Sequence, residues 1–202
     1  MPAKSIPSFW ASAFCFITYP LAICFIYPTS MSLTHDLLLT DLQQQFAAAI
    51  LQTEMPADVA PDQLTITLHR DGVLPILRYL KAHAQFQFNF LTDICGAHYP
   101  DNEPSREFAV VYHLHSWTNN YRLRLKTYCS RTDCSVPSAV SVFPSANWQE
   151  RETYDFYGIQ FAEHPDLRRI LNVDEMNFFP LRKEYPLEEQ TRTDKNDKMF
   201  GR

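Results

Sequence analysis

Residues 147–158 read NWQERETYDFYG, and this stretch predicts a short helix. Asn147 can cap its N-terminus, and Glu150 stands three residues further on, in the position of a capping box. Gly158 is a natural stop, because glycine readily adopts the left-handed conformation in which many helices end. We therefore expect a compact helical element late in the chain.

One face of this helix mixes aromatic and charged side chains. Trp148, Glu152 and Phe156 are spaced four residues apart and share a face, and Arg151 and Asp155 form an i, i+4 pair beside it. Charges among aromatic rings are costly to bury unless they are paired. Such residues must join an internal network or contact another polypeptide, so the helix is a candidate protein interface.

The residues before this helix predict an α+β domain. Hydrophobic periodicity indicates helices at 36–53 and after Asp71, and strands at 64–68, 86–94, 107–115 and 121–128. The last of these strands has one apolar and one basic face, the linker 116–120 suits a tight hairpin, and 139–143 either pairs or leads onward. We expect an antiparallel or mixed β-sheet of about four strands with two helices on one face, the short helix, and a long extended C-terminal arm.

Overall composition argues against several functional classes. The 202 residues carry a formal net charge of −5, which favours neither nucleic acid nor anionic lipid as a partner. Five cysteines with irregular spacing do not describe a secreted disulfide framework. Cys129 and Cys134 are close enough in sequence for a hairpin disulfide or two metal ligands. Because no CxxC pair occurs, reduced thiols are a better expectation than an iron–sulfur site.

The first thirty residues form an apolar leader, with no charged side chain from Ser5 to Thr34. Three interpretations are open. Residues 9–27 could just span a bilayer as a helix, or the leader could be a signal peptide. We favour the third, in which translation begins at Met31 and Ser32 or Thr34 caps the first helix.

The last thirty residues lack periodicity, contain two prolines and mix charges of both signs. A structureless run of this length is uncommon in a compact domain unless it is functional or disordered. It is also too apolar for a plain solvated tail. We expect an arm that lies across a partner and fills its pockets with Phe178, Phe179, Leu181, Tyr185, Leu187 and Phe200.

The segment ERETYDFYGIQFAEHPDLRRIL (150–171) carries a specific pattern: Glu150-Arg151-Glu152, Asp155-Phe156-Tyr157, His164, Arg168 and Ile170-Leu171. Here the chain resembles the C subunit of respiratory complex I (NADH:quinone oxidoreductase). The resemblance covers residues 86–190 and includes FNFLTDICGAHYP, VVYHLHSW, VPSAVSVFPSANW and PLRKEYPLE. It departs at 176–179, where many members have a Trp-Glu-Gly-His-like stretch, so a role for a histidine there is in doubt.

The resemblance implies a non-catalytic structural subunit of the hydrophilic arm of a proton-translocating NADH:quinone oxidoreductase. Such a subunit docks on the D subunit near the quinone site, with the B and I subunits as neighbours. It is peripheral on the cytoplasmic side of the bacterial inner membrane, with which it associates through the complex. The resemblance implies no cofactor in this chain, since FMN, the iron–sulfur clusters, NADH and quinone belong to other subunits.

We accordingly divide the chain into a leader (1–30), an α+β domain (31–145), a signature helix and turn (146–171) and a partner-binding arm (172–202). We expect no catalytic or metal-binding residue. The candidates for the partner interface are Glu150, Arg151, Glu152, Asp155, His164, Arg168, Arg182, Lys183 and Tyr185.

Other functions are less well supported by the sequence. A related hydrogenase or ferredoxin-oxidising complex could use the same kind of subunit, because donor specificity would reside elsewhere. A stand-alone metal-dependent hydrolase would use Glu150 or Glu152 with His164, but two glutamates two residues apart on a helix are a poor acid–base pair. His113 and His115 share a strand face without a third ligand in view. The basic residues near Arg168 and Arg182 are interspersed with acids, which favours salt bridges over nucleic acid.

Overall fold

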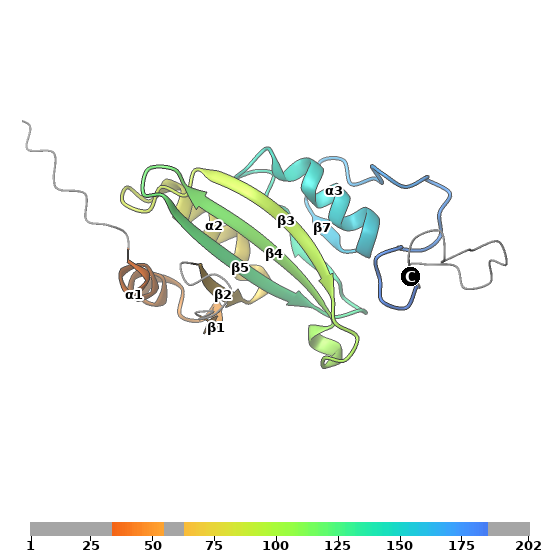
Figure 1. The fold of residues 1–202 in the computed structure, drawn as a ribbon, viewed down its shortest axis with the longest axis horizontal. Coiled ribbons are helices and arrows are strands. Elements are labelled where there is room, and N and C mark those ends of the chain that lie inside the picture. Colours follow the sequence, from red (N-terminus) through yellow and green to blue (C-terminus); the bar gives the residue numbers. More distant parts are fainter. Residues whose placement is uncertain (1–33, 55–62, 186–202) are drawn as a thin grey trace, which may run out of the picture. The chain divides into compact units, whose positions relative to one another are not determined.

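The computed structural model describes residues 34–54 and 63–185 (Figure 1). The first helix, α1 (His35–Phe46), is capped by Thr34, whose side chain accepts the N–H of Leu37 at 3.4 Å. The leader 1–30, and with it the question of the start at Met31, lies outside the described residues. So does the end of the expected arm, with Leu187 and Phe200.

The expected helix at 36–53 is too long. After α1 ends at Phe46, the chain turns and forms an edge strand, β1 (Ile50–Glu54), antiparallel to β2 (Leu64–Leu68). The apolar residues Ala49 and Ile50 continue the helical spacing of α1, but the pairing of Ile50 with Leu68 commits them to the sheet. Tertiary pairing here overrides the local pattern.

Five strands form a mixed sheet in the order β1-β2-β5-β4-β3. Its other members are β3 (Phe90–His98), β4 (Phe108–Ser116) and β5 (Tyr121–Cys129). Only β2 and β5 run parallel within this sheet, and the three remaining pairings are antiparallel. The expected α+β class is confirmed, with five strands in place of about four.

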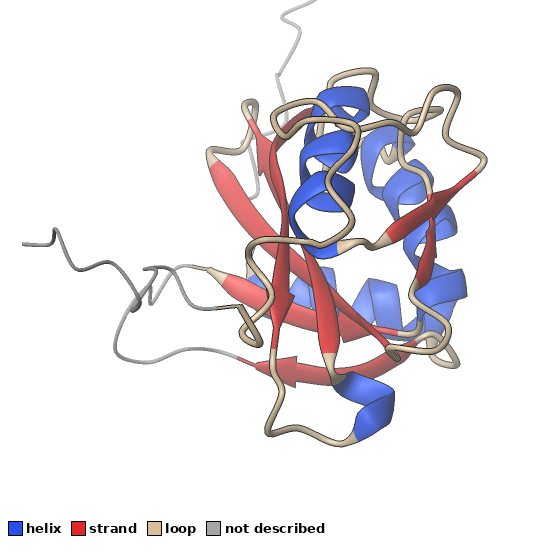
Figure 2. Cartoon of the chain, turned by 90° about the vertical axis from the view of Figure 1, so that its right-hand side faces the viewer, coloured by secondary structure: helices blue, strands red, loops and turns tan. Residues whose placement is uncertain are grey.

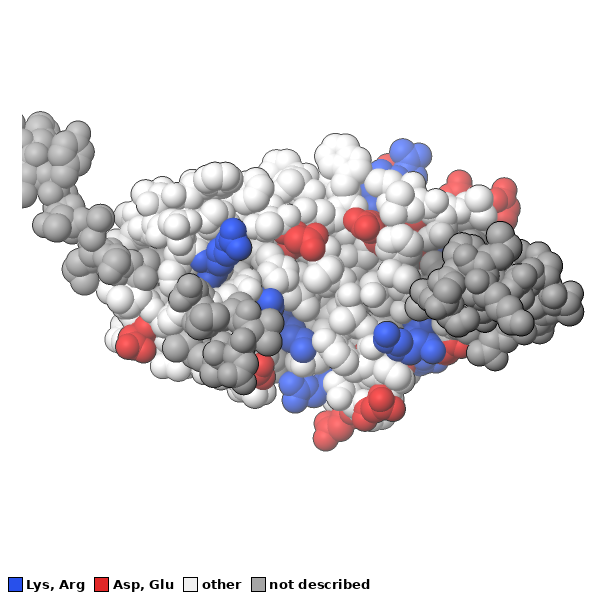
Figure 3. All heavy atoms as spheres, viewed as in Figure 1, with Lys and Arg blue, Asp and Glu red and all other residues white. Residues whose placement is uncertain are grey.

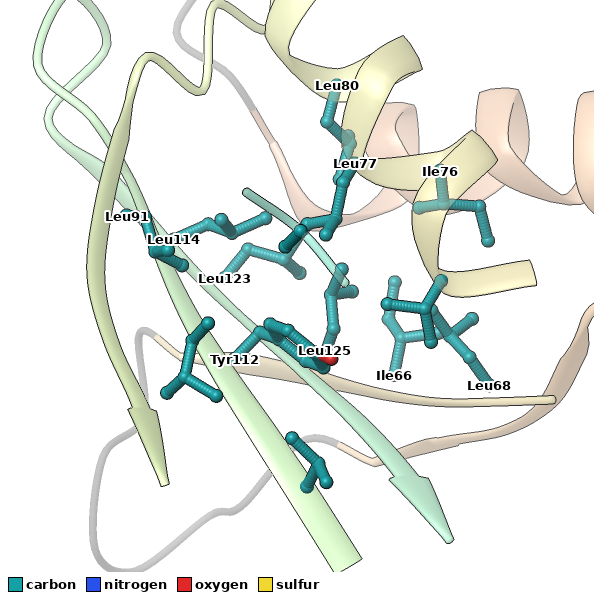
Figure 4. Packing of buried hydrophobic residues seen from close by; sticks show 14 of the residues in the cluster. Ile66, Leu68, Ile76, Leu77, Leu80, Leu91, Tyr112, Leu114, Leu123 and Leu125 are labelled. Carbon is teal, nitrogen blue, oxygen red and sulfur yellow. The ribbon is translucent and has the colours of Figure 1, made fainter. Parts of the chain in front are cut away.

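The core lies between this sheet and the helices, which Figure 2 shows gathered on one side of it. Helix α2 (Val73–Ala82) follows a 3-10 turn at Arg70–Gly72, so Asp71 lies in this turn and does not cap the helix. Figure 4 shows the buried side chains of α2 facing those of β2, β4 and β5. This central set comprises Ile66, Ile76, Leu77, Leu80, Tyr112, Leu114, Leu123 and Leu125.

Two short segments differ from the expected strands. The alternation that predicts a strand at 86–94 begins too early, because Phe86 and Phe88 are buried in a loop that closes over the end of α2, where the N–H of Phe88 bonds to the Leu80 carbonyl at 3.1 Å. Residues 139–143 form a turn. The extra pairing lies instead between β6 (Ser135–Pro137) and β7 (Gln160–Ala162), which are parallel.

Helix α3 (Ala146–Tyr157) is the signature helix, and Gly158 ends it at φ 77° as expected. The predicted cap is wrong: Ser145 occupies the N-cap position, without a side-chain cap bond, and Asn147 lies in the first turn. Backbone carbonyls of the preceding turn take over part of the capping role, since the N–H of Ala146 bonds to the Phe143 carbonyl at 2.9 Å.

Helix α3 packs against β3 at Gly96, the point that fixes the helix on the domain. A Cβ atom at Gly96 would lie 2.6 Å from Cδ2 of Tyr157 and 3.0 Å from Cγ2 of Thr153. The Thr153 hydroxyl also donates to the Ile94 carbonyl at 3.3 Å. Close approach of helix and strand therefore requires a residue without a side chain at position 96.

Gly96→Ala is expected to lower the free energy of unfolding by about 1–3 kcal/mol, because the added methyl overpacks the contact with Tyr157. Denaturant titration of the full chain measures this loss. The control is Thr92→Ala, an exposed position on the same strand, which should change stability by less than about 0.5 kcal/mol. Equal stability of Gly96→Ala and the parent chain would show that α3 does not depend on this contact.

Candidate protein-interaction site

The Asp155 carboxylate organises the residues that follow α3. It is fully buried, and its Oδ1 accepts a hydrogen bond from Nη1 of Arg169 at 2.7 Å. Its Oδ2 accepts three successive backbone N–H groups, those of Ile170 at 3.1 Å and of Leu171 and Asn172 at 2.8 Å each. A single side chain thereby fixes the path of the backbone at 169–172.

These contacts keep Asp155 ionised although it is buried. Burial alone would raise its pKa, but the hydrogen bonds from the Asn172 and Leu171 N–H groups and from Arg169 outweigh it and hold the pKa well below the usual range. A buried carboxylate of this kind stabilises the fold only while all its partners are present. Asp155 is therefore an internal anchor.

Two arginines, Arg169 and Arg182, connect the residues that follow Asn172 to Asp155 and to the end of α3. Arg169 donates through Nη2 to the carbonyls of Met176 at 2.7 Å and Phe178 at 3.0 Å. Arg182 donates through Nε to the Tyr157 carbonyl at 2.7 Å, at the C-terminal end of α3. Both guanidinium groups lie over the Phe179 ring, 5.0 and 4.6 Å from its centroid. We call residues 169–185 the anchored segment.

Gly158 makes room for this segment. A Cβ at this position would meet Cε2 of Phe179 at 2.5 Å and Nη2 of Arg182 at 2.6 Å. The N–H of Leu181 also bonds to the Phe156 carbonyl at 3.2 Å, so the last turn of α3 receives donors from the anchored segment. The glycine thus ends the helix and admits the aromatic and cationic side chains that cover its end.

The predicted pair of Arg151 with Asp155 does not form. Arg151 donates to the carbonyls of Arg168 at 3.1 Å and Arg169 at 3.0 Å, and the ion partner of Asp155 is Arg169. The i, i+4 spacing allows the pair, but the segment returning alongside α3 offers each side chain better-placed partners. Sequence reasoning named the adjacent Arg168 as an interface candidate and gave no such role to Arg169.

Glu150, the first residue of the signature pattern, is also fully buried. Its Oε2 accepts the Ser138 hydroxyl at 2.7 Å, and its Oε1 accepts the Ala139 N–H at 2.6 Å. Burial raises the pKa of Glu150 to about 7, against the lowering effect of these two hydrogen bonds. Its role is to hold the 138–139 turn against α3, so the expected capping box is wrong.

His164 lies beside Glu150 and is fixed by backbone groups. Its Nδ1 accepts the N–H of Asp166 at 3.0 Å, which leaves Nε2 to donate to the Asn147 carbonyl at 3.2 Å. The Glu150 carboxylate is 4.0 Å from the same Nε2. Both side chains are fully buried, so this histidine has a structural place in the turn after β7.

A second histidine, His98, ties the anchored segment to the sheet. Its Nδ1 accepts the N–H of Lys183 at 2.9 Å, and its Nε2 contacts Glu107 at 3.0 Å. Arg131 bridges Glu107 at 2.9 Å and Glu184 at 2.8 Å. Sequence reasoning gave no role to His98, Glu107 or Arg131, because their partners in the anchored segment are remote along the chain.

The nine interface candidates divide into two groups. Glu150, Asp155 and His164 are buried within the chain, and Arg151 and Arg182 are partly buried with their donors used internally. The others are exposed: Glu152, Arg168, Lys183 and Tyr185. The structure thus buries Glu150, Asp155 and His164 as internal supports, and leaves Glu152, Arg168, Lys183 and Tyr185 on the surface.

Apolar side chains of the anchored segment are exposed in a group that we call the apolar patch. Its members are Leu171 at 63%, Val173 at 62%, Phe178 at 40%, Leu181 at 38% and Tyr185 at 37% exposure. The rings of Phe178 and Tyr185 contact each other, with centroids 5.0 Å apart. Because exposed apolar groups gathered on one segment are typical of interaction surfaces, the apolar patch is a candidate docking surface.

The described residues offer little for other kinds of site. Within residues 34–54 and 63–185, no group of three or more His, Cys, Asp or Glu side chains is placed to hold a metal ion. His113 is occupied by the Gln63 amide at 3.1 Å. None of the described helices has the length and apolar character needed to cross a bilayer. On the face drawn in Figure 3, basic and acidic side chains are interspersed.

Glu150→Gln is expected to change how stability depends on pH. Because folding raises the pKa of Glu150 from 4.5 to about 7, its contribution is complete below pH 4.5 and is lost as the pH rises to about 7. Relative to Glu150→Gln, the parent chain should lose on the order of 2 kcal/mol between pH 5 and pH 8. Denaturant titrations at both pH values measure this, with exposed Glu152→Gln as the control. Parallel pH profiles for all three chains would contradict the assignment.

Comparison with known proteins identifies the family of this chain. The family model described as "Respiratory-chain NADH dehydrogenase, 30 Kd subunit" matches residues 66–191. The C subunit of the NADH-quinone oxidoreductase of Hyphomonas neptunium is 47% identical over 147 residues, which cover 69% of this chain and 70% of that protein. Its counterpart from Geobacter sulfurreducens is 45% identical over 148 residues, 73% of this chain and 86% of that protein.

Solved structures show the same fold. The trypsin-resistant fragment (1-134) of Nqo5 superposes with a TM-score of 0.53 at 34% identity, and covers 64% of this chain and 98% of that one. A chain of the membrane-bound sulfane sulfur reductase, an archaeal respiratory membrane complex, shares the fold with a TM-score of 0.62 at 20% identity, and covers 75% of this chain and 85% of that one. The chain belongs to the family of the 30 Kd subunit of the respiratory-chain NADH dehydrogenase, complex I.

Proposed function

We propose that this chain is a non-catalytic structural and assembly subunit in the hydrophilic arm of a proton-translocating NADH:quinone oxidoreductase. In this role it docks on the D subunit near the quinone site. Membership of the family supports a place in complex I, and docking on the D subunit is the more specific step that we propose. The apolar patch is the observation that carries it.

The patch is suited to docking because its backbone is already ordered in the chain alone. Asp155 holds its N-terminal end, Arg169 and Arg182 hold its middle, and His98 holds Lys183 near its C-terminal end. A surface fixed before binding avoids much of the entropy cost of ordering a loop on a partner. Within residues 172–185, Leu181 and Arg182 bond to the end of α3 while several apolar side chains stay exposed.

Exposed charged side chains lie on and next to the anchored segment and on α3. Arg168 is 70% exposed in its side chain and pairs with Asp166 at 3.0 Å, while Lys183 and Glu152 are also exposed. An apolar centre with a polar rim is the usual composition of a protein interface. Arg168, Lys183 and Glu152 are our candidates for salt bridges to the D subunit.

The rival hydrolase gains no support from the site. A general base must reach the proton that it abstracts, but Glu150 is fully buried and both its oxygens accept hydrogen bonds from Ser138 and Ala139. His164 beside it is equally buried and is held by backbone groups. In a docking role the exposed residues contact the partner, and buried residues such as Glu150 and His164 hold the fold that presents them.

The remaining parts of the proposal rest on membership of the family. We propose the B and I subunits as neighbours, with FMN, iron–sulfur clusters, NADH and quinone bound by other subunits. The chain would then lie on the cytoplasmic side of the inner membrane, attached through the complex. The alternative is that the chain is the corresponding subunit of a hydrogenase or ferredoxin-oxidising complex. Identifying the subunits that co-purify with the chain distinguishes this complex from an NADH:quinone oxidoreductase.

The double variant Leu171→Asp, Val173→Asp is expected to weaken binding to the D subunit at least about tenfold, equivalent to ~1.4 kcal/mol, because it places charges at the two most exposed positions of the patch. Co-expression and pull-down with the D subunit measures the loss, and the thermal unfolding of the free chain should not change.

The matched control is Leu51→Asp, which alters a leucine of similar exposure (62%) on β1. It should leave binding intact. Unchanged capture of the D subunit by the double variant would contradict the proposed docking site. Normal capture combined with lower quinone reductase turnover per assembled complex would contradict the non-catalytic role.

A further inference from the structure

Cys129 and Cys134 lie in contact, with their Sγ atoms 2.8 Å apart, and both are free thiols. Cys129 ends β5, and Cys134 directly precedes β6. Neither residue has a place in the docking site described above. Two thiols at this separation need little movement to form a disulfide.

The turn between the two cysteines is held from several directions. Asp133 forms an ion pair with Arg70, and Arg131 pairs with Glu107 and Glu184. The Cys134 carbonyl accepts the N–H of Gln160 at 2.8 Å, which fixes the far end of the turn to β7. Because both ends and the middle of the turn are fixed, the two sulfur atoms are kept facing each other.

Cys129 also lines a pocket of about 550 Å³, which gives a small solute a route to a side chain that is only 3% exposed. Arg70 and Arg106 line the same pocket. Arg106 lies over the Tyr128 ring, 4.3 Å from its centroid. The pocket thus admits a small oxidant to Cys129.

The two thiols have different environments. The Cys129 thiol beside it and its own burial both raise the pKa of Cys134, so Cys134 holds its proton. Cys129 lines the pocket and Cys134 is not among the residues that line it. Because the pocket leads to Cys129 and the Cys134 sulfur lies directly behind it, Cys129 has the attacking part and Cys134 the resolving part.

We propose that Cys129 and Cys134 form a redox modification site that reacts with hydroperoxides to give an intramolecular disulfide. The Cys129 thiolate attacks one oxygen of hydrogen peroxide, the O–O bond breaks, and the departing hydroxide takes up the proton lost from Cys129 to form water. The Cys129 sulfenic acid is then attacked by the Cys134 sulfur, which releases a second water and forms the S–S bond. Overall, two thiols are oxidised and one hydroperoxide is reduced to two waters.

Trypsin provides a direct assay, because Arg131 lies between the two cysteines. The full chain, first reduced and then treated with one equivalent of hydrogen peroxide, is digested without reductant and analysed by mass spectrometry. We expect peptide 127–131 linked to peptide 132–151, with the mass of their sum less two hydrogens. Free peptides at both positions, with peroxide consumed elsewhere in the chain, would overturn the proposal.

Single variants test the two roles. Cys134→Ser should accumulate a sulfenic acid on Cys129 that a dimedone-type reagent captures, whereas Cys129→Ser should give no capture at Cys134. The control is Cys95→Ser, which should leave the link unchanged, since burial and the nearby Asp93 raise the pKa of the Cys95 thiol. In the parent chain Cys95 should react at least about tenfold more slowly than Cys129. Capture at Cys134 with an inert Cys129 would reverse the assignment and contradict it.

Discussion

The buried carboxylate of Asp155 is the interaction on which the second half of the structure depends. It supplies the charge that holds Arg169, and its other oxygen collects three consecutive backbone N–H groups. Residues 163–185 contain neither helix nor strand, so they cannot satisfy their own backbone through regular structure. The Asp155 carboxylate instead accepts several of these backbone N–H groups, and so fixes the irregular chain at one point.

The α+β domain serves as the platform for this anchor. Gly96 lets α3 approach β3, α3 presents Asp155, and Gly158 leaves room for Phe179 and Arg182 over the end of the helix. The network His98–Glu107–Arg131–Glu184 then joins the far end of the anchored segment to the sheet. Together these contacts explain how a chain without a metal-binding cluster among its described residues can offer a rigid, partly apolar surface to a larger assembly.

Sequence reasoning was most accurate where structure is set locally. β2, β4 and β5 match their predicted limits to within one residue, because alternating burial is visible in the sequence itself. β1 was missed because its first residues continue the helical spacing of α1 and its pairing with β2 is not visible locally. Asn147 was misassigned as a cap because a hydrogen bond from the preceding backbone turn partly caps the helix. The signature residues were identified as important, but the burial of Glu150 and Asp155 was not predicted. Glu150 is buried by contacts with residues 138–139, and Asp155 by contacts with residues 169–172. No spacing within the helix reveals those contacts.

Hydrogen exchange of the backbone amides at 170–172 tests the central claim most directly. In the isolated chain these amides should be protected although they lie in irregular structure, and Asp155→Asn should speed their exchange at least about tenfold while the amides of β4 keep their protection. If these amides exchanged in the parent chain as fast as those of an unstructured peptide, or if Asp155→Asn left them protected, the carboxylate would not be the anchor described above.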